Sequence, residues 1–478
     1  MTEENKLNSD VKSTRPTRKS IWNDLIDALS GTEADYTKIK LNKAIFLLAV
    51  PMILELAMES IFAVVDMIFV GKLGSSAIAS VGLTETFMFL LYSVAMGLSM
   101  AITAIISRRI GEKKKEEAGL AGVQAIILAL IASLPFTVLG IFYSKELLSL
   151  MGGDAWSIEH GYRYTQWMLG GNAVIVFIFV INAIYRGAGD AAIAMRVLII
   201  ANSINIVLDP ILIFGWGFIP AFGIEGAAIA TNIGRGCGVL IQLWILFKGG
   251  KHIKIVTSQL VLDFKIMWHI FKTSLGGIGQ MLVSMTAWIF LIRILSDIGV
   301  EAVAASTIVI RLIMFTLMPA WGLSNAAATL VGQNLGADHP ERAESAVWKI
   351  GLYNMIFLIG VSLCYFFFCE NLMKIFTDEP EVIKIGSEWL RILSYSYFIY
   401  GWWMVAVQAF NGAGDTKTPT WINIIFFWLI QIPLSYLLAI HYNWEHSGVF
   451  WAVLVTESLA GVFTVWLFSK GKWKTSKV

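Results

Sequence analysis

The sequence predicts an all-α polytopic membrane protein, with twelve transmembrane helices in two pseudo-symmetric six-helix bundles around a central cleft. Of its 478 residues, 57% are hydrophobic and only 15% are charged, whereas soluble domains average roughly 45–50% apolar and about 25% charged residues. The apolar residues form long blocks, and motifs of the first half recur in the second. This composition excludes a soluble enzyme, and the net charge of +2 gives no indication of nucleic-acid binding.

Twelve apolar blocks are long enough to be membrane spans, since a helix crosses the bilayer with about 20 residues. The first six blocks are residues 43–71, 76–107, 118–143, 161–186, 191–215 and 223–248. The second six are residues 266–296, 301–332, 345–369, 385–411, 418–440 and 446–469. They divide the chain into an N-terminal segment (1–40), a first lobe (41–248), a linker (249–265), a second lobe (266–470) and a tail (471–478).

Lys and Arg indicate the orientation of the spans, because cytoplasmic loops carry an excess of both residues. They gather in the N-terminal segment, in the loop after the second block, in the linker and in the tail, whereas the loop at 215–223 has no charged residue. We therefore expect both termini in the cytoplasm, and a multi-pass protein of a bacterial or archaeal cytoplasmic membrane.

The two halves of the chain repeat each other at a constant distance. Gly-Ala-Gly-Asp at 187–190 recurs at 412–415, and Gly-Leu-Ser at 97–99 recurs at 322–324, so both motifs return after the same interval. Repeats with an even number of spans have the same topology and are related by an axis along the membrane normal. In transporters built this way the substrate path lies between the halves, which rock to expose it to each side in turn.

Carboxylates inside the membrane are costly and mark functional sites. Glu55, Glu59 and Asp66 of the first block fall within about 40° of one another on a helix, so they share one face. The fifth block adds Asp209, which lies one helical turn after Asn205 and shares its face. Either H⁺ or Na⁺ could neutralise such carboxylates, which favours an ion-coupled machine.

The second half lacks these acids. At the offset that relates the repeated motifs, Gln280 stands opposite Glu55 and Ser284 opposite Glu59. With the aromatic Trp288, which offers a cation–π face, these residues are expected to line a cleft for organic cations or amphiphiles. In the alternative interpretation each acid pairs structurally with a basic residue, for which Arg293 and Arg311 of the other half are candidates.

Taken together, these features resemble the multidrug and toxic compound extrusion (MATE) transporters. The resemblance rests on Pro51, Asp66 and Gly71, on Arg186 to Asp190, on Asn205, Asp209 and Pro210, on Gly223 and Thr231, and on Gly412 to Asp415. It implies an antiporter that exports amphipathic, often cationic compounds in exchange for H⁺ or Na⁺. It implies neither enzymatic activity nor a cofactor, and we expect a monomer in the bilayer.

The first half is most similar to the DinF-type branch of that family, whose coupling site lies in the first lobe. The resemblance to this branch implies a coupling site made of Asp66, Asn182, Asn205, Asp209 and Thr231. A bound Na⁺ would then take ligands from Asp66, Asn205, Asp209 and Thr231. Glu59 adds an acid to the ion-coupling set, at a position where this branch is expected to have Gln.

A flippase for a lipid-linked saccharide, from the same superfamily, is the alternative function. It would need basic residues along the central path to bind pyrophosphate, whereas the candidate interior of this chain is acidic in sequence. Motifs of membrane-embedded enzymes and of nucleotide-binding domains are absent from the sequence.

Overall fold

The computed structural model describes residues 18–250 and 252–476 of the chain. Residues 1–17, 251 and 477–478, which belong to the predicted N-terminal segment, linker and tail, lie outside the described residues. In the described part every extended regular element is a helix, and an isolated β-bridge joins Trp216 to Ile219.

The first lobe contains six membrane crossings, preceded by a short helix, α1 (Arg18–Ser30), that packs on α2. Its helices are α2 (Leu41–Gly71), α3 (Ser75–Gly111), α4 (Lys115–Leu150), η2 (Ser157–Gly161), α5 (Tyr162–Gly170), α6 (Ala173–Ala188), α7 (Ala191–Phe214) and α8 (Ile224–Lys248). The segments η2, α5 and α6 together form one crossing. This crossing is interrupted at Gly171 and Asn172, where the Asn172 amide donates hydrogen bonds to α4.

The second lobe follows after a short 3₁₀ turn, η3 (Thr257–Gln259), in the linker. Its helices are α9 (Phe264–Ile298), α10 (Val300–Gly336), α11 (Pro340–Lys374), α12 (Pro380–Ser394), α13 (Tyr397–Gly412), α14 (Lys417–Asn423), η4 (Ile424–Gln431), α15 (Ile432–Tyr436), η5 (Leu437–His441) and α16 (Glu445–Ser469). A last 3₁₀ turn, η6 (Lys472–Thr475), ends the described chain.

Eleven helices of the described part are long and apolar enough to cross a membrane. The remaining crossing consists of α12 and α13, neither of which spans alone because the helix is interrupted at Tyr395 and Ser396. Ser396 is the repeat counterpart of Gly171, so the two lobes repeat even in the place of their interrupted crossing. The predicted fold of twelve crossings in two bundles is thereby confirmed.

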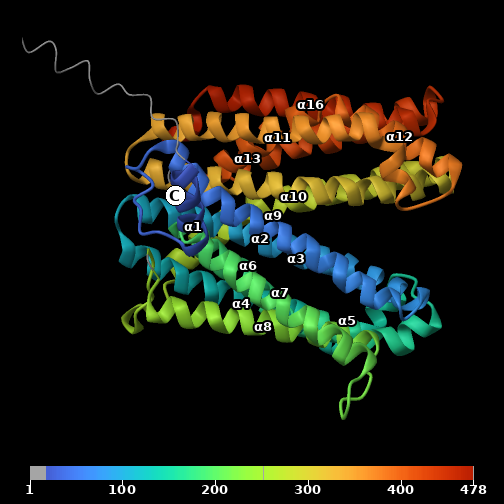
Figure 1. Cartoon of the computed structure of the whole chain (residues 1–478), viewed down its shortest axis with the longest axis horizontal. Coiled ribbons are helices and arrows are strands. Elements are labelled where there is room, and N and C mark those ends of the chain that lie inside the picture. The colour runs from blue at the N-terminus through green and yellow to red at the C-terminus, as the bar shows by residue number, and fades with distance from the viewer. Residues whose placement is uncertain (1–17, 251, 477–478) are drawn as a thin grey trace, which may run out of the picture.

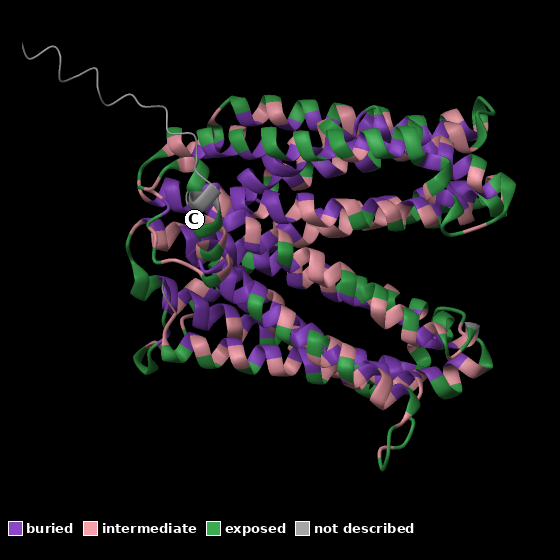
Figure 2. Ribbon diagram, viewed as in Figure 1, coloured by how far each residue is buried: buried purple, intermediate pink, exposed green. Residues whose placement is uncertain are grey.

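The two lobes diverge as the arms of a V from the end that carries α1 and the C-terminus (Figure 1). Buried residues concentrate at this joined end and inside each arm (Figure 2). Large apolar side chains such as Phe142, Leu240 and Phe367 are exposed on the spanning helices. Such exposure is expected where a helix faces lipid tails rather than water.

The joined end depends on close contact between α3 and α10. A Cβ atom on Gly111 would overlap the carbonyl oxygen of Gln333, and one on Gly336 would overlap that of Arg108. Glycine at these positions lets the backbones approach. The Gln333 amide also donates a 3.0 Å hydrogen bond to the carbonyl of Gly187, which links the second lobe to the end of α6.

The segments at both ends of the chain also bridge the lobes. The Tyr36 hydroxyl donates to the carbonyl of Gly189 in the first lobe, and Arg342 of α11 donates to the carbonyl of Tyr36.

The tail reaches the first lobe through Arg108 of α3, which donates to the carbonyl of Ser476. Within the second lobe, Lys474 of the tail lies 2.6 Å from a carboxylate oxygen of Glu344. This hydrogen bond raises the pKa of Lys474 above its usual value.

Candidate functional site

Three of the predicted site residues meet inside the first lobe, between α7 and α8. Asp209 is fully buried at 0% exposure, and one of its carboxylate oxygens lies 3.4 Å from the amide nitrogen of Asn205. The same nitrogen lies 3.3 Å from the hydroxyl oxygen of Thr231. Gly234 of α8 makes this approach possible, since a Cβ there would lie 2.7 Å from the carbonyl oxygen of Ala201 on α7.

Asp66 of α2 faces the same region from the neighbouring helix. Its carboxylate is half-buried and close enough to interact electrostatically with Asp209. Three buried oxygens of this group have no hydrogen-bond partner among the described residues: Asp66 Oδ1, Asn205 Oδ1 and Asp209 Oδ2. Buried polar atoms are almost always satisfied, so a group of unpaired acceptors calls for a cation or proton to complete it.

The donor set fits the predicted ion. The described residues hold no group of three or more His, Cys, Asp or Glu side chains arranged to bind a metal ion. An ion at this place would combine carboxylate oxygens of Asp66 and Asp209 with the hydroxyl oxygen of Thr231. The amide oxygen of Asn205 would join them after a turn of that side chain, because its nitrogen faces Asp209 and Thr231 in this structure. Oxygen ligands of this kind suit H⁺ or a hard monovalent cation, and we call Asp66, Asn205, Asp209 and Thr231 the acceptor cluster.

Glu55 and Glu59 do not belong to the acceptor cluster, because each is in an ion pair. Glu55 Oε1 lies 2.7 Å from Arg186, and Glu59 Oε1 lies 2.5 Å from Arg235. Asn182 also donates to Glu55 Oε1, at 3.0 Å. The structure therefore places Asn182 with the Glu55–Arg186 pair rather than against Asp209.

The sequence-based candidates for structural partners of the acids were Arg293 and Arg311, and this expectation is wrong for Glu55 and Glu59. Both partners come from the first lobe itself, Arg186 from α6 and Arg235 from α8. Arg293 instead pairs with Asp297 one turn along its own helix, at 3.2 Å. Arg235 lies within the sixth apolar block, so the rule for charges at membrane depth already marked it as a candidate.

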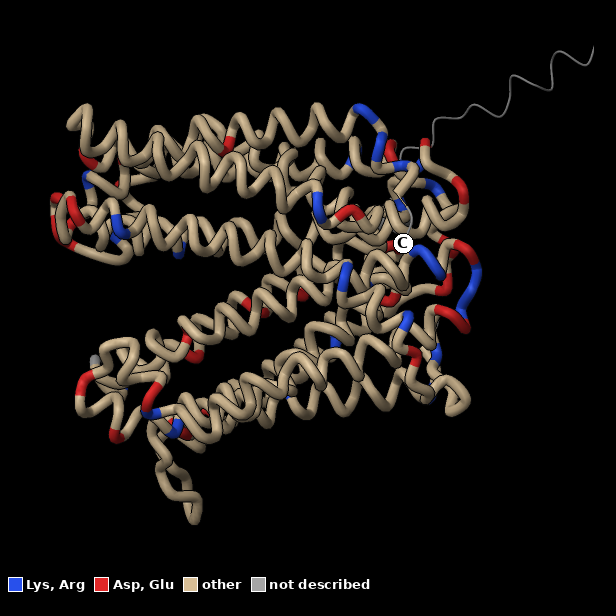
Figure 3. The backbone as a smooth tube through the Cα atoms, turned by 180° about the vertical axis from the view of Figure 1, so that it is seen from behind, with Lys and Arg blue, Asp and Glu red and all other residues tan. Residues whose placement is uncertain are grey.

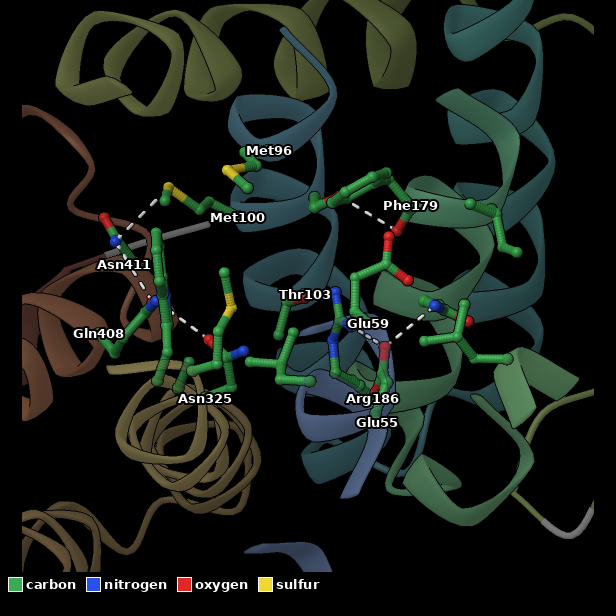
Figure 4. Close-up of a pocket in the computed structure, with 18 of the residues that line it drawn as sticks. Glu55, Glu59, Met96, Met100, Thr103, Phe179, Arg186, Asn325, Gln408 and Asn411 are labelled. Carbon is green, nitrogen blue, oxygen red and sulfur yellow. Dashed lines mark hydrogen bonds and ion pairs between the residues drawn. The ribbon is translucent and has the colours of Figure 1, made fainter. Parts of the chain in front are cut away.

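A cavity lies between the lobes, beside these ion pairs, and encloses about 1020 Å³ of empty space including its open mouth. In Figure 4 Glu55, Glu59 and Arg186 lie on one side of it, and Asn325, Gln408 and Asn411 of the second lobe lie on the other. Apolar and sulfur-containing side chains complete the wall. They include Met96, Met100, Phe179, Met318 and Trp321.

Three residues expected in the substrate cleft lie elsewhere. Gln280, Ser284 and Trp288 do not line this cavity, which corrects the expectation that they share one cleft with Glu55. The Gln280 amide donates to Asn411 and to the carbonyl of Thr416 inside the second lobe. Ser284 accepts a hydrogen bond from Asn423, and Trp288 packs on Trp389.

Two acids on spanning helices escaped the sequence analysis. Glu85 of α3 is exposed on its arm and interacts electrostatically with Arg311 of α10 in the other lobe. Glu457 of α16 is half-buried and interacts with Tyr397 and Tyr400 of α13. Both lie within apolar blocks, so the rule for charges at membrane depth marks them as well. The internal repeat does not predict either acid, because the residues of the second lobe that correspond to Glu55 and Glu59 are uncharged.

Comparison with known proteins settles the family. The MatE family model matches residues 51–211 and again residues 274–437, one match in each lobe. The chain belongs to the MATE family. Its two matches agree with the internal repeat.

Relatives of similar length are named as transporters. A "Probable multidrug resistance protein NorM" of Thermotoga maritima is 26% identical over 92% of this chain and 94% of its own. An "FAD transporter" of Shewanella oneidensis is 26% identical over 85% of this chain and 89% of its own. This MATE protein is therefore a polytopic membrane transporter of small molecules.

Solved MATE structures share the whole fold. One described as the outward-facing conformation of a multidrug resistance MATE family transporter has a TM-score of 0.86 and 25% identity. The match covers 94% of this chain and 99% of that chain. Another, a superfamily member from Pyrococcus furiosus described as having a binding pocket of reverse polarity, has a TM-score of 0.85 and 25% identity, over 95% of this chain and 99% of that chain.

Proposed function

We propose that this MATE protein is a secondary antiporter of the DinF-type branch, which exports amphipathic, often cationic organic compounds in exchange for H⁺ or Na⁺. The observation that carries the proposal is the acceptor cluster, with its three unpaired buried oxygens, next to a cavity between two lobes. Binding a cation there would satisfy those oxygens, and releasing it would leave two carboxylates that repel each other.

The direction of transport follows from the proposed orientation. Most of the Lys and Arg residues lie at the joined end, near the C-terminus, and few charged residues lie in the middle of either arm (Figure 3). Basic residues favour the cytoplasmic side, so we place the joined end in the cytoplasm and the open end outside, in a bacterial or archaeal cytoplasmic membrane. The structure then corresponds to the state that releases substrate outward and takes up the coupling ion.

Alternating access would use the charge state of the acceptor cluster. Repulsion between Asp66 and Asp209 is strong in surroundings of low dielectric constant, and it acts between α2 and α7. Pro51 of α2 and Pro210 of α7 each interrupt the backbone hydrogen bonding of their helix, which makes bending easier. A cation would relieve the repulsion and so favour one arrangement of the helices over the other.

The cavity wall supports an amphipathic substrate. Methionines adapt to ligands of different shape, and aromatic faces attract organic cations. Two arginines line the cavity beside two glutamates, which corrects the expectation of an acidic interior. Arg186 and Arg235 are each paired with a glutamate, so neither offers an uncompensated positive charge to a pyrophosphate. We therefore favour the antiporter over the lipid-linked saccharide flippase.

Transport by the purified protein in proteoliposomes tests the proposal. The two probes are tetraphenylphosphonium and ethidium, under an imposed pH gradient or an imposed Na⁺ gradient. We expect accumulation against the probe gradient with one of the two ions, and its loss when an ionophore collapses that gradient. Equal probe flux with and without both gradients would contradict the proposal. Translocation of a lipid-linked saccharide without accumulation of either cation would support the flippase instead.

A further inference from the structure

Arg235 lies over α2 between two carboxylates. Its guanidinium is stacked 5.3 Å from the centre of the Phe62 ring, and it pairs with Glu59 three residues before Phe62. Asp66 follows Phe62 by four residues, and residues spaced three or four apart share a helix face. Arg235 also interacts electrostatically with Asp66. The arginine therefore has one carboxylate on each side of its aromatic platform.

The hydrogen bonding of both Arg235 and Asp66 is incomplete. Arg235 is only 5% exposed, and its Nε–H has no acceptor among the described residues. Asp66 Oδ1 is buried and has no donor. Buried donors and acceptors of this kind are rare in folded proteins. The Nε–H of Arg235 and Oδ1 of Asp66 could satisfy each other if the two side chains met.

The other charged groups near Asp66 strengthen this interpretation. Glu85 of α3 and Asp209 of α7 both repel its carboxylate, and the phenol of Tyr92 lies in the same region. Arg235 is the basic side chain that acts on Asp66 among the described residues. If the coupling ion leaves Asp66, the positive charge available to replace it is therefore Arg235.

We propose that Arg235 exchanges partners between Glu59 and Asp66, and that this exchange makes the coupling ion and a cationic substrate mutually exclusive. The inference rests on the proposed antiport. Glu59 and Arg235 line the cavity whereas Asp66 does not, so the arginine is the link between ion site and substrate site. It is a positioning residue, since it acts through the two carboxylates.

The exchange has two states. With an ion on Asp66, Arg235 stays on Glu59, the pairing that the structure shows, and its positive charge neutralises the Glu59 carboxylate, which then does not attract a cationic substrate. When the ion leaves, Asp66 attracts Arg235, and Glu59 becomes available to bind a cation in the cavity. A planar guanidinium stacked on Phe62 suits this role, because its N–H groups point in several directions while its stacking is kept.

Binding measurements on the purified protein in detergent test the exchange. The probe is tetraphenylphosphonium, titrated at low and at high concentration of the coupling ion. For the wild type we expect the ion to weaken probe binding by about tenfold or more. In Arg235→Gln, Glu59 has no internal partner, so probe binding should be tight and nearly independent of the ion. Arg235→Lys should restore part of the ion dependence.

A second measurement uses no substrate. In Glu59→Gln, Arg235 has Asp66 as its remaining partner, so the affinity for the coupling ion should fall by about tenfold. A purely structural role of the Glu59–Arg235 pair would not shift ion affinity. The double variant Glu59→Gln/Arg235→Gln removes both charges of the pair and should bind the probe weakly at every ion concentration, which separates the effect of a freed Glu59 from the loss of Arg235 itself. Arg163→Gln, which breaks an exposed pair with Glu225 away from this cavity, should keep the ion dependence.

Unchanged ion dependence in Arg235→Gln, together with unchanged ion affinity in Glu59→Gln, would overturn the exchange. That result would leave the antiport intact if the wild type still exports against a gradient. If the proposed function is wrong, the result is different: transport by the wild type does not depend on either ion gradient.

Discussion

At the residue scale, Asp209 carries a cost in stability. It is fully buried, yet one of its carboxylate oxygens has no hydrogen-bond partner among the described residues. Leaving a buried polar atom unpaired costs about 1–3 kcal/mol, and more for a charged group. Unpaired atoms of Asn205 and Asp66 lie in the same region. The proposed coupling ion would offset this cost by binding to the unpaired oxygens.

Thr231 offers a residue-scale test with a matched control. Thr231→Val keeps the shape of the side chain but removes the hydroxyl oxygen that lies 3.3 Å from the Asn205 amide. We expect the affinity for the coupling ion to fall about fivefold, which corresponds to roughly 1 kcal/mol for one hydrogen-bonding group. Isothermal titration calorimetry with the coupling ion measures the change.

Thr231→Ser keeps the hydroxyl and should bind the ion like the wild type. Thr456 is the repeat counterpart of Thr231 on α16 and is also buried, so Thr456→Val is the control and should leave ion affinity unchanged. Wild-type affinity in Thr231→Val, or an equal loss in Thr456→Val, would remove Thr231 from the acceptor cluster.

At this scale the sequence predicted the acids better than their partners. Asp66 and Asp209 stand out because a carboxylate in an apolar block is conspicuous, and the spacing of Asn205 and Asp209 placed them together. The pairing of Glu55 with Arg186 and of Glu59 with Arg235 depends on which helices are neighbours in space, and spacing along one helix does not contain that information.

At the scale of elements, the contact between α3 and α10 decides whether the joined end can close. Gly111 and Gly336 are each placed against a backbone carbonyl of the other helix, so the helices touch through their backbones. This contact crosses from one lobe to the other. It must separate if the joined end opens, which makes the balance between the two states sensitive to a single methyl group.

Gly336→Ala should therefore disfavour the present V-shaped state and shift the population toward one in which the joined end is open. Spin labels on cysteines introduced at Leu150 and Ile375, both highly exposed, would report the distance between the open ends of the two arms by electron–electron double resonance after replacement of the native cysteines. We expect a shorter distance to gain population.

Gly360→Ala is the control, because a Cβ on Gly360 of α11 meets nothing within 4 Å. It should give the wild-type distance distribution. The same distribution for Gly336→Ala would show that the contact between α3 and α10 does not limit closure.

The sequence predicted the helical elements well, but not their interruptions or their ends. The fourth block was predicted as continuous, whereas the crossing is interrupted at Gly171 and Asn172. The third block was predicted to end at residue 143, whereas α4 continues to Leu150 after a kink at Tyr143. Hydropathy detects only the continuous apolar run. Beyond the kink the helix has mixed polarity, so hydropathy does not show that it continues.

At the scale of the whole molecule, a symmetric scaffold carries an asymmetric set of charges. The constant offset between the repeated motifs predicted two lobes of equal topology, and the structure repeats even the interruption of one crossing. Sequence could not predict which end of the V is open, because both states use the same helices. The acceptor cluster lies entirely in the first lobe, so we assign ion coupling to that lobe.

Glu457 makes this assignment testable, because it is a carboxylate on a spanning helix of the other lobe. The deciding measurement compares gradient-driven accumulation of tetraphenylphosphonium in proteoliposomes by the wild type, Asp66→Asn and Glu457→Gln. We predict that Asp66→Asn loses accumulation against a gradient, while Glu457→Gln accumulates the probe as the wild type does. Wild-type accumulation by Asp66→Asn, with loss in Glu457→Gln, would contradict coupling through the first lobe.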